Sequence, residues 1–392
     1  MYRRSLVVIL LAAVVVLAAF GFGVWKLHKP AERKTDGIPS VDAEIDAVWP
    51  SPDFSRIVLA LRRKTTDPNL VFDYGMAIFD PAKKRITAEL PNYPSDTYGG
   101  RPAWSPDSEW IAVRGNDRNL LLVDRDGGRK RILNPGGKRP NIGYYAWRPS
   151  PPNRLVYALY GVPSELREYN VETSTDRLIF KEVHFCHTIE GLFNVKGNMC
   201  AAYLMPNAAW RSYNRVFVEK IDTHRRILEL PLNGMSFDGM DFDMSPDGEM
   251  FVFRWGESLY GDMIVGNTKD VATTWTHPWR QIMGDGGHDL SPKPMITWRP
   301  PHHGTSTPSS WTAIMNSTKG YLLFYSRGGW DVLRMLPERP ASFSWWEDNT
   351  YLAIDKDGLW ITNNGRNLVH KGVSLPDPYR EKLILRHKPA GR

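Results

Sequence analysis

Four aspartates fall within one short stretch of the chain, at Asp238, Asp241, Asp243 and Asp247. Clustered carboxylates are the ligands that hard cations such as Ca²⁺ prefer. An EF-hand loop requires glycine at its sixth position, which counted from Asp241 is Pro246, so the stretch is not an EF-hand. Calcium held by Asp238, Asp241 and Asp243 is one alternative. Our expectation is a protein without a cofactor and without a metal site.

The densest group of nitrogen and sulfur ligands is His184-Phe-Cys186-His187. A zinc site needs three or four converging ligands, and the spacings Cys-x₂-Cys and His-x₃₋₅-His are missing from the sequence. We interpret this group as a loop. Cys186 and Cys200 are the two cysteines. The expected hairpin places Cys200 opposite Leu192, several residues from Cys186, and a disulfide needs Cα atoms within about 7 Å, so their pairing stays open.

The equipment of a serine hydrolase is missing from the sequence. A nucleophile elbow has the pattern Gly-x-Ser-x-Gly, whereas the glycines around Ser258 stand at Gly256 and Gly261, which is the wrong spacing. No α/β segment follows the β-rich body, which continues almost to the end of the chain. The pattern therefore argues against a peptidase of this kind.

An internal repeat predicts the elements that would position any site. Its unit is an aromatic residue, a turn of Pro, Asp and Gly, and then a β-rich run, most clearly in Trp104-Ser-Pro-Asp107 before Trp110–Val113 and in Met244-Ser-Pro-Asp-Gly248 before Met250–Phe253. Two further short runs follow in each unit, and the first of them is predicted as a strand, such as Leu120–Asp124 or Tyr321–Ser326. The anchor residues, spaced 43 to 55 residues apart, are Trp49, Trp104, Trp147, Phe193, Met244, Trp298 and Trp345.

The repeated turn has a mechanical explanation. Proline presets φ in a tight turn, Asp accepts hydrogen bonds from nearby amides, and Gly relaxes the geometry. The aromatic anchor ends the innermost strand, where a large flat ring fills the gap to the next blade. We therefore interpret the repeated Trp and Asp residues as structural.

Seven units of four short antiparallel strands predict an all-β protein, a β-propeller of seven blades, with six or eight blades as alternatives because the Phe193–Gly197 copy is degenerate. The Trp-Ser-Pro-Asp-Gly pattern resembles the repeat of TolB-like bacterial propellers and of the propeller domains of prolyl-oligopeptidase-type enzymes. The TolB-like resemblance implies a protein or peptide partner that approaches the mouth of the central channel.

The repeat also indicates where a site would lie. Residues three positions before each anchor take equivalent places on the innermost strands, and they are Asp46, Arg101, Tyr144, Glu190, Asp241, Met295 and Ser342. The first five place three carboxylates, an arginine and a tyrosine on one ring that lines the channel. Loops and side chains converge at such a concave place, which favours binding of a ligand or partner. Simple hydration of the channel is the alternative.

The N-terminus reads as a membrane segment. Arg3 and Arg4 precede an uncharged apolar run from Leu6 to Val24, and nineteen helical residues span about 28 Å, the thickness of a hydrocarbon core. We predict an uncleaved signal anchor, a transmembrane helix over residues 1–25, with cleavage near Ala19 as the alternative. A flexible tether over 26–40 and the propeller over 41–371 follow.

The net charge of +7 lies at the two ends of the chain. Residues 1–40 carry +4 and the basic tail 372–392 carries +3, so the body between them is neutral, which argues against nucleic acid as a partner. Positive charges flank the apolar run on both sides, and we expect a single pass through the cell inner membrane with the propeller in the periplasm. The tail either adds a strand to the last blade or docks on a partner.

These observations favour a non-catalytic subunit, a scaffold that binds a protein or peptide within a cell-envelope complex. The competing class is a propeller enzyme, such as a metal-dependent hydrolase, a lactonase or a glycan lyase, with its site in the central channel. That class predicts a bound metal near Asp238, Asp241 and Glu190.

Overall fold

The computed structural model describes residues 38–64, 72–91, 101–115, 119–133, 142–159, 165–181, 188–206, 213–235, 240–255, 262–268, 296–298, 312–316, 321–326, 329–334, 343–346, 350–355, 357–362 and 382–388. The chain divides into two compact units, Met1–Ile38 and Pro39–Arg392, and every described strand belongs to the second. Among the described residues no helix is long and apolar enough to cross a membrane. The predicted anchor at 1–25 lies outside these residues.

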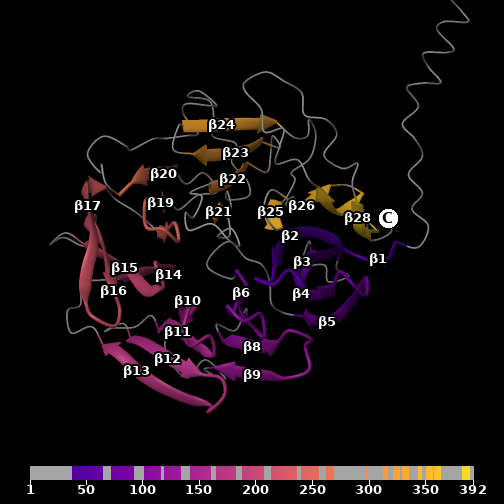
Figure 1. Ribbon diagram of the computed structural model, residues 1–392, viewed down its shortest axis with the longest axis horizontal. Coiled ribbons are helices and arrows are strands. Elements are labelled where there is room, and N and C mark those ends of the chain that lie inside the picture. The colour runs from indigo at the N-terminus through magenta and orange to yellow at the C-terminus, as the bar shows by residue number, and fades with distance from the viewer. Residues whose placement is uncertain are drawn as a thin grey trace, which may run out of the picture. The chain divides into compact units, whose positions relative to one another are not determined.

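The described strands form seven sheets, which we number in chain order (Figure 1). Sheet 1 consists of β2 (Glu44–Pro50), β3 (Ile57–Lys64), β4 (Phe72–Asp80) and β5 (Arg85–Pro91). Sheet 2 consists of β6 (Ala103–Trp104), β7 (Trp110–Arg114), β8 (Leu120–Asp124) and β9 (Lys130–Leu133). Sheet 3 consists of β10 (Ile142–Trp147), β11 (Arg154–Leu159), β12 (Glu165–Asn170) and β13 (Thr175–Lys181). Sheet 4 consists of β14 (Thr188–Val195), β15 (Asn198–Pro206), β16 (Tyr213–Lys220) and β17 (Arg225–Met235).

The remaining sheets follow the same plan. Sheet 5 consists of β18 (Met240–Met244), β19 (Met250–Trp255) and β20 (Asp262–Asn267). Sheet 6 consists of β21 (Ile296–Trp298), β22 (Thr312–Asn316), β23 (Tyr321–Ser326) and β24 (Gly329–Arg334). Sheet 7 holds β25 (Phe343–Trp346), β26 (Thr350–Asp355), β27 (Gly358–Thr362), β28 (Lys382–His387) and β1 (Ser40–Val41). The strands predicted at Leu120–Asp124 and Tyr321–Ser326 are confirmed to the residue.

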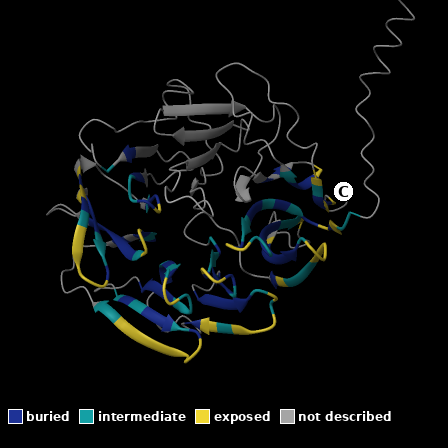
Figure 2. Cartoon of the chain, viewed as in Figure 1, coloured by how far each residue is buried: buried dark blue, intermediate teal, exposed yellow. Residues whose placement is uncertain are grey.

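The hydrophobic cores lie between neighbouring sheets. One cluster joins Val58 and Ile78 of sheet 1 to Ile111 and Val123 of sheet 2, and further clusters join sheets 2 and 3, 3 and 4, and 4 and 5. Middle strands therefore have both faces covered, and β8 is buried along its whole length instead of alternating. Figure 2 shows the exposed residues gathered on the outer strands, such as β13.

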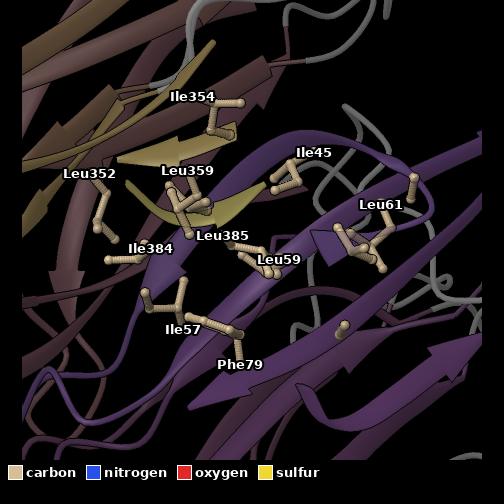
Figure 3. Close-up of a cluster of buried hydrophobic side chains, with 14 residues drawn as sticks. Ile45, Ile57, Leu59, Leu61, Phe79, Leu352, Ile354, Leu359, Ile384 and Leu385 are labelled. Atoms are coloured by element: carbon tan, nitrogen blue, oxygen red, sulfur yellow. The ribbon is translucent and has the colours of Figure 1, made fainter. Parts of the chain in front are cut away.

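The last sheet returns to the first. Leu352, Leu359 and Leu385 of sheet 7 share one cluster with Leu59 and Phe79 of sheet 1 (Figure 3). Sheets packed in chain order, with the last against the first, form a β-propeller, which leaves few strand edges open.

The C-terminal tail takes part in this closure. Strand β28 lies beyond residue 371 and pairs with β27, so the tail adds a strand to the last sheet. Strand β1 pairs in parallel with β28, with Ser40 opposite Arg386. The backbone N–H groups of Arg386 and Lys388 donate to the carbonyls of Pro39 and Val41 at 2.9 and 2.8 Å. The two ends of the described body are thus held together by hydrogen bonds.

A buried serine organises the repeated turn. In sheet 2, the Ser105 hydroxyl donates to the Asp107 carboxylate and accepts from the backbone N–H of Trp110 at 2.8 Å, while Asp107 accepts from the N–H of Glu109 at 3.1 Å. The turns that begin at Ser51 and Ser245 repeat this network. The predicted role of Asp as an acceptor is confirmed.

The aromatic anchors join neighbouring sheets, as predicted. The indole N–H of Trp104 donates to the carbonyl of Trp49 at 3.0 Å, and that of Trp147 donates to the carbonyl of Ala103 at 2.7 Å. In the degenerate fourth unit the anchor is Phe193, and the next residue, Asn194, donates its amide to the carbonyl of Trp147 at 3.1 Å. An amide thus makes the bond between sheets that an indole makes elsewhere.

Candidate functional site

The predicted ring residues lie on or beside the first strands of their sheets. Asp46 is in β2, Tyr144 in β10, Glu190 in β14 and Asp241 in β18, while Arg101 stands just before β6. The first strands of neighbouring sheets contact one another, β6 with β10, β10 with β14, β14 with β18, and β2 with β25. They are therefore the inner strands (Figure 1). The side chains of Glu190 and Asp241, and all of Met295 and Ser342, lie outside the described residues.

Three of these residues sit at the same irregularity of the sheet. In the pairing of β2 with β3, Ile45 lies opposite Leu61 and Ala47 opposite Ala60, so no residue of β3 lies opposite Asp46. Glu190 is left out in the same way between Ile189 and Gly191.

The third irregularity is in sheet 3, where Gly143 and Tyr144 together face one residue, because Ile142 pairs with Leu159 and Tyr145 with Tyr157. Asp241 differs, since it pairs regularly with Arg254. A β-bulge changes the direction of a side chain and ends regular pairing locally, and bulges are frequent beside active and binding sites.

Asp46 belongs to a small charged group on sheet 1. Its Oδ1 lies 3.5 Å from Nε of Arg62, whose guanidinium also binds the carboxylate of Glu44. Burial raises the pKa of Asp46 and the nearby Glu44 adds to the rise, while Arg62 acts against it. Burial makes the ionised form of this carboxylate less favourable, so a positively charged or hydrogen-bond-donating group that binds it would stabilise that form.

The backbone beside Arg101 is bound directly to sheet 3. The hydroxyl of Tyr145 donates to the carbonyl of Arg101 at 2.6 Å and accepts from the backbone N–H of Arg114 at 3.3 Å. Tyr145 is buried and follows Tyr144 in the chain. This contact therefore fixes the positions of Arg101 and Tyr144 relative to each other.

The strands that carry Glu190 and Asp241 approach each other closely at a glycine. A Cβ at Gly191 would lie 2.3 Å from the carbonyl oxygen of Phe242, so only glycine allows β14 and β18 to approach this closely. Each strand carries its ring residue directly before the point of approach. The two carboxylate positions are thus neighbours on the inner strands.

No protein-family model matches the chain, and no curated protein matches it. Solved structures similar to it include the β-propeller domain of Cps50 (Swd1) from Myceliophteria thermophila, at 12% identity and a TM-score of 0.49, covering 83% of this chain and 98% of that one. Another is the β-propeller domain of the Trilobed protease from Pyrococcus furiosus, at 10% identity and a TM-score of 0.47, covering 88% of this chain and 99% of that one. Both are propeller domains.

The other candidates from the sequence have different outcomes. Within the described part of the chain, no group of three His, Cys, Asp or Glu residues is placed to hold a metal. Asp238 lies outside the described residues. The Asp243 carboxylate accepts a hydrogen bond from the N–H of Met244 at 2.8 Å, and the Asp247 carboxylate accepts one from the N–H of Glu249 within its own turn. The calcium alternative therefore stays a hypothesis.

The cysteine hairpin is close to the one expected. Cys200 pairs with Phe193 in β14, one residue from the expected partner Leu192. It is a buried free thiol, and burial raises its pKa to about 11. A thiol with so high a pKa is a weak nucleophile at neutral pH. His184, Cys186 and His187 lie outside the described residues.

Proposed function

We propose that this chain is a seven-bladed, membrane-anchored propeller of the TolB-like kind, which acts outside the cytoplasm as a non-catalytic scaffold. It binds a protein or peptide partner within a cell-envelope complex. The partner is held at the inner-strand ring of Asp46, Arg101, Tyr144, Glu190 and Asp241. The observation that carries the proposal is the recurrence of a bulge at the ring position in three sheets, at Asp46, Tyr144 and Glu190.

The chemistry of the ring supports a peptide more than an apolar ligand. Carboxylates bind lysine, arginine or amide N–H groups of a partner, a tyrosine provides a flat surface with a hydroxyl, and Arg101 offers a donor to carbonyls or carboxylates. Loss of regular pairing at a bulge also leaves local backbone groups for a visiting chain to bind. A mixed set of this kind recognises a polar segment.

Purification of the full-length protein from its native membrane in mild detergent, followed by mass spectrometry, tests the proposal. We expect a stoichiometric partner with the wild type and its loss in the variant Asp46→Asn, Tyr144→Phe, Glu190→Gln. The matched control changes the same chemistry elsewhere, with Tyr74→Phe, Glu89→Gln and Glu172→Gln, and retains the partner. Equal recovery from both variants, each with a melting temperature no lower than that of the wild type, would place the binding surface elsewhere.

The enzyme alternative rests on the close approach of the strands that carry Glu190 and Asp241 at Gly191. A calcium ion or other metal at this place would give the ring Lewis-acid chemistry. Metal analysis of the purified full-length protein decides between the classes. About one equivalent of metal, lost in the variant Glu190→Gln, supports the enzyme, and a metal content below a tenth of an equivalent removes it.

A further inference from the structure

One face of the body is built from two kinds of turn. In sheet 2 the backbone N–H of Arg125, at the end of the third strand, donates to the carbonyl of Glu109 in the turn between the first two strands, at 3.0 Å. Val171 and Asn153 repeat this bond in sheet 3, also at 3.0 Å. The turns after the first strand and after the third strand therefore lie side by side. We call this surface the turn face.

The turn face is continuous from sheet 1 to sheet 2. The N–H of Asp53 donates to the Ser108 hydroxyl at 3.0 Å, and the guanidinium of Arg56 pairs with Asp126 at 2.7 Å. The turn at Gly127 packs directly against Ala88 of β5. Charges on the outer turns of these two sheets therefore share one surface.

Four cations on this surface form no ion pair with another described residue. Among the described residues, Lys83 pairs with Asp80 and Arg129 pairs with Asp124. The remaining cations of these two outer turns and of the strands that follow them have no ion-pair partner within the described part of the chain, and they are Lys84 in its turn, Arg85 at the start of β5, and Lys130 and Arg131 at the start of β9. We call these four residues the basic edge. All are exposed except Arg131, which is half-buried.

Arg131 is held in place by neutral groups. Its guanidinium donates to the hydroxyls of Ser174 at 2.6 Å and Tyr169 at 3.3 Å, and it lies 5.7 Å from the ring of Trp110. These contacts fix the side chain and leave its charge intact. Since residues 41–371 are neutral as a whole, other residues of the body carry the balancing negative charge, among them Asp107 and Glu109 on the turn face itself.

The start of the body is oriented toward the same face. The fourth strand of each sheet runs away from the turn face, because it follows the turn after the third strand. Strand β1 is parallel to β28, the fourth strand of sheet 7, so the chain enters β1 from the direction of the turn face, while Ser40 itself lies opposite Arg386 near the far end of β28. Sheet 7 packs against sheet 1, which carries Lys84 and Arg85.

From this geometry we infer that the basic edge docks on the anionic phospholipid surface of the membrane in which the chain is anchored. The inference rests on the anchor of the proposed function and not on the partner. Cations that form no ion pair with another described residue suit an extended negative surface, and each cation near such a surface improves binding about fivefold. The ring residues Asp46 and Glu190 come early in strands that run toward the turn face, so docking leaves the opposite end free for a partner.

Amine acylation of the full-length protein in nanodiscs tests the inference, with Lys84 and Lys130 as reporters and Lys64, at the far end of β3, as the internal control. In nanodiscs that contain phosphatidylglycerol, we expect both reporters to react about fivefold more slowly than in pure phosphatidylcholine, with Lys64 unchanged. About 1 M NaCl, where the Debye length is about 3 Å, should remove the protection.

Two variants sharpen the test. The change Arg85→Gln with Arg131→Gln should bring the reporter rates in the two lipids within about twofold of each other, since two cations are lost. The control Arg63→Gln, near Lys64, should keep the protection. Reporter rates that are equal in both lipids overturn the inference, and so does protection that is seen in native membranes and not in nanodiscs, which would indicate an acidic protein as the occupant.

The anchor is scored separately by whether the chain copurifies with the nanodiscs. If it does not, nanodiscs are added to the purified chain and the same rates are measured. Slower reaction with phosphatidylglycerol still supports the basic edge, and equal rates overturn it. Failure of partner capture in the purification described above leaves these rates unaffected, so the two proposals fail independently.

Discussion

Asp46 and Glu190 occupy the same place in two different sheets, because each is left out of the pairing between the first and second strands. Each also stands three residues before the anchor of its repeat. A structural repeat normally conserves what packing needs, and an unpaired residue gives no packing benefit to the ladder. The equivalence of the two bulges is what makes the inner strands the candidate site.

Replacement of Asp46 with Asn should stabilise the protein at neutral pH. Burial raises the pKa of Asp46, so its charge opposes folding at neutral pH, and this cost disappears as the pH falls through the raised pKa. We expect the melting temperature to rise by about 1–3 °C at neutral pH and to match the wild type in acid. A lower melting temperature at neutral pH would show that Asp46 holds the fold together.

Asp222 should behave in the opposite way. Its hydrogen bonds with Arg148, at 2.8 and 2.9 Å, join sheets 4 and 3 and lower its pKa. That contribution is present at pH values above the usual carboxyl range and is lost as the pH falls through the lowered pKa. For Asp222→Asn we expect a melting temperature about 1–2 °C lower at neutral pH, a small effect because the carboxylate is exposed, and no difference once the pH is below the lowered pKa. A pH-independent difference would contradict this explanation.

The bond between Trp104 and Trp49 should be measurable by chemical denaturation. Trp104→Phe keeps a ring in the gap between sheets but leaves the Trp49 carbonyl without its donor. We expect the free energy of unfolding to fall by about 1–3 kcal/mol. Asn194→Ala removes the corresponding bond to Trp147 and should lie in the same range. Losses below about 0.5 kcal/mol in both variants would mean that the anchors act only by filling space.

Two glycines allow steric contact to be separated from backbone conformation. Gly191→Ala places a methyl group 2.3 Å from the Phe242 carbonyl, whereas Gly197→Ala meets nothing within 4 Å but requires an alanine at φ +74°. We expect a loss of about 1–2 kcal/mol for Gly197→Ala and a larger loss for Gly191→Ala, since two inner strands must move apart. Thermal unfolding of both variants checks the order, and the reverse order would contradict the close approach.

Much of the fold was predictable because short stretches of sequence determine where each strand and each turn lies. Runs such as Leu120–Asp124 are apolar throughout, since both faces of a middle strand are covered, and turn residues mark where each run stops. The recurrence of a serine in the turn could also be predicted, because Ser51, Ser105 and Ser245 precede Pro-Asp in three units. Its role as a hydrogen-bond hub was missed.

The bulges were not predictable from these patterns. A bulge depends on how many residues two paired strands use to cover the same length, and no residue type marks it at Asp46, Tyr144 and Glu190. The role of Asn194 was hidden for a similar reason, since an amide next to Phe193 gives no sign that it reaches the Trp147 carbonyl. Contacts between distant segments set both features.

Photocrosslinking in native membranes tests the central claim most directly. A photoreactive phenylalanine analogue at Tyr144, on an inner strand, is compared with the same analogue at Ile132, an exposed residue of the outer strand β9. We predict one major protein adduct from position 144 that is weaker when Asp46→Asn and Glu190→Gln are added, and no such adduct from position 132. Adducts of equal yield from both positions, or from 132 alone, would contradict a partner held at the inner-strand ring.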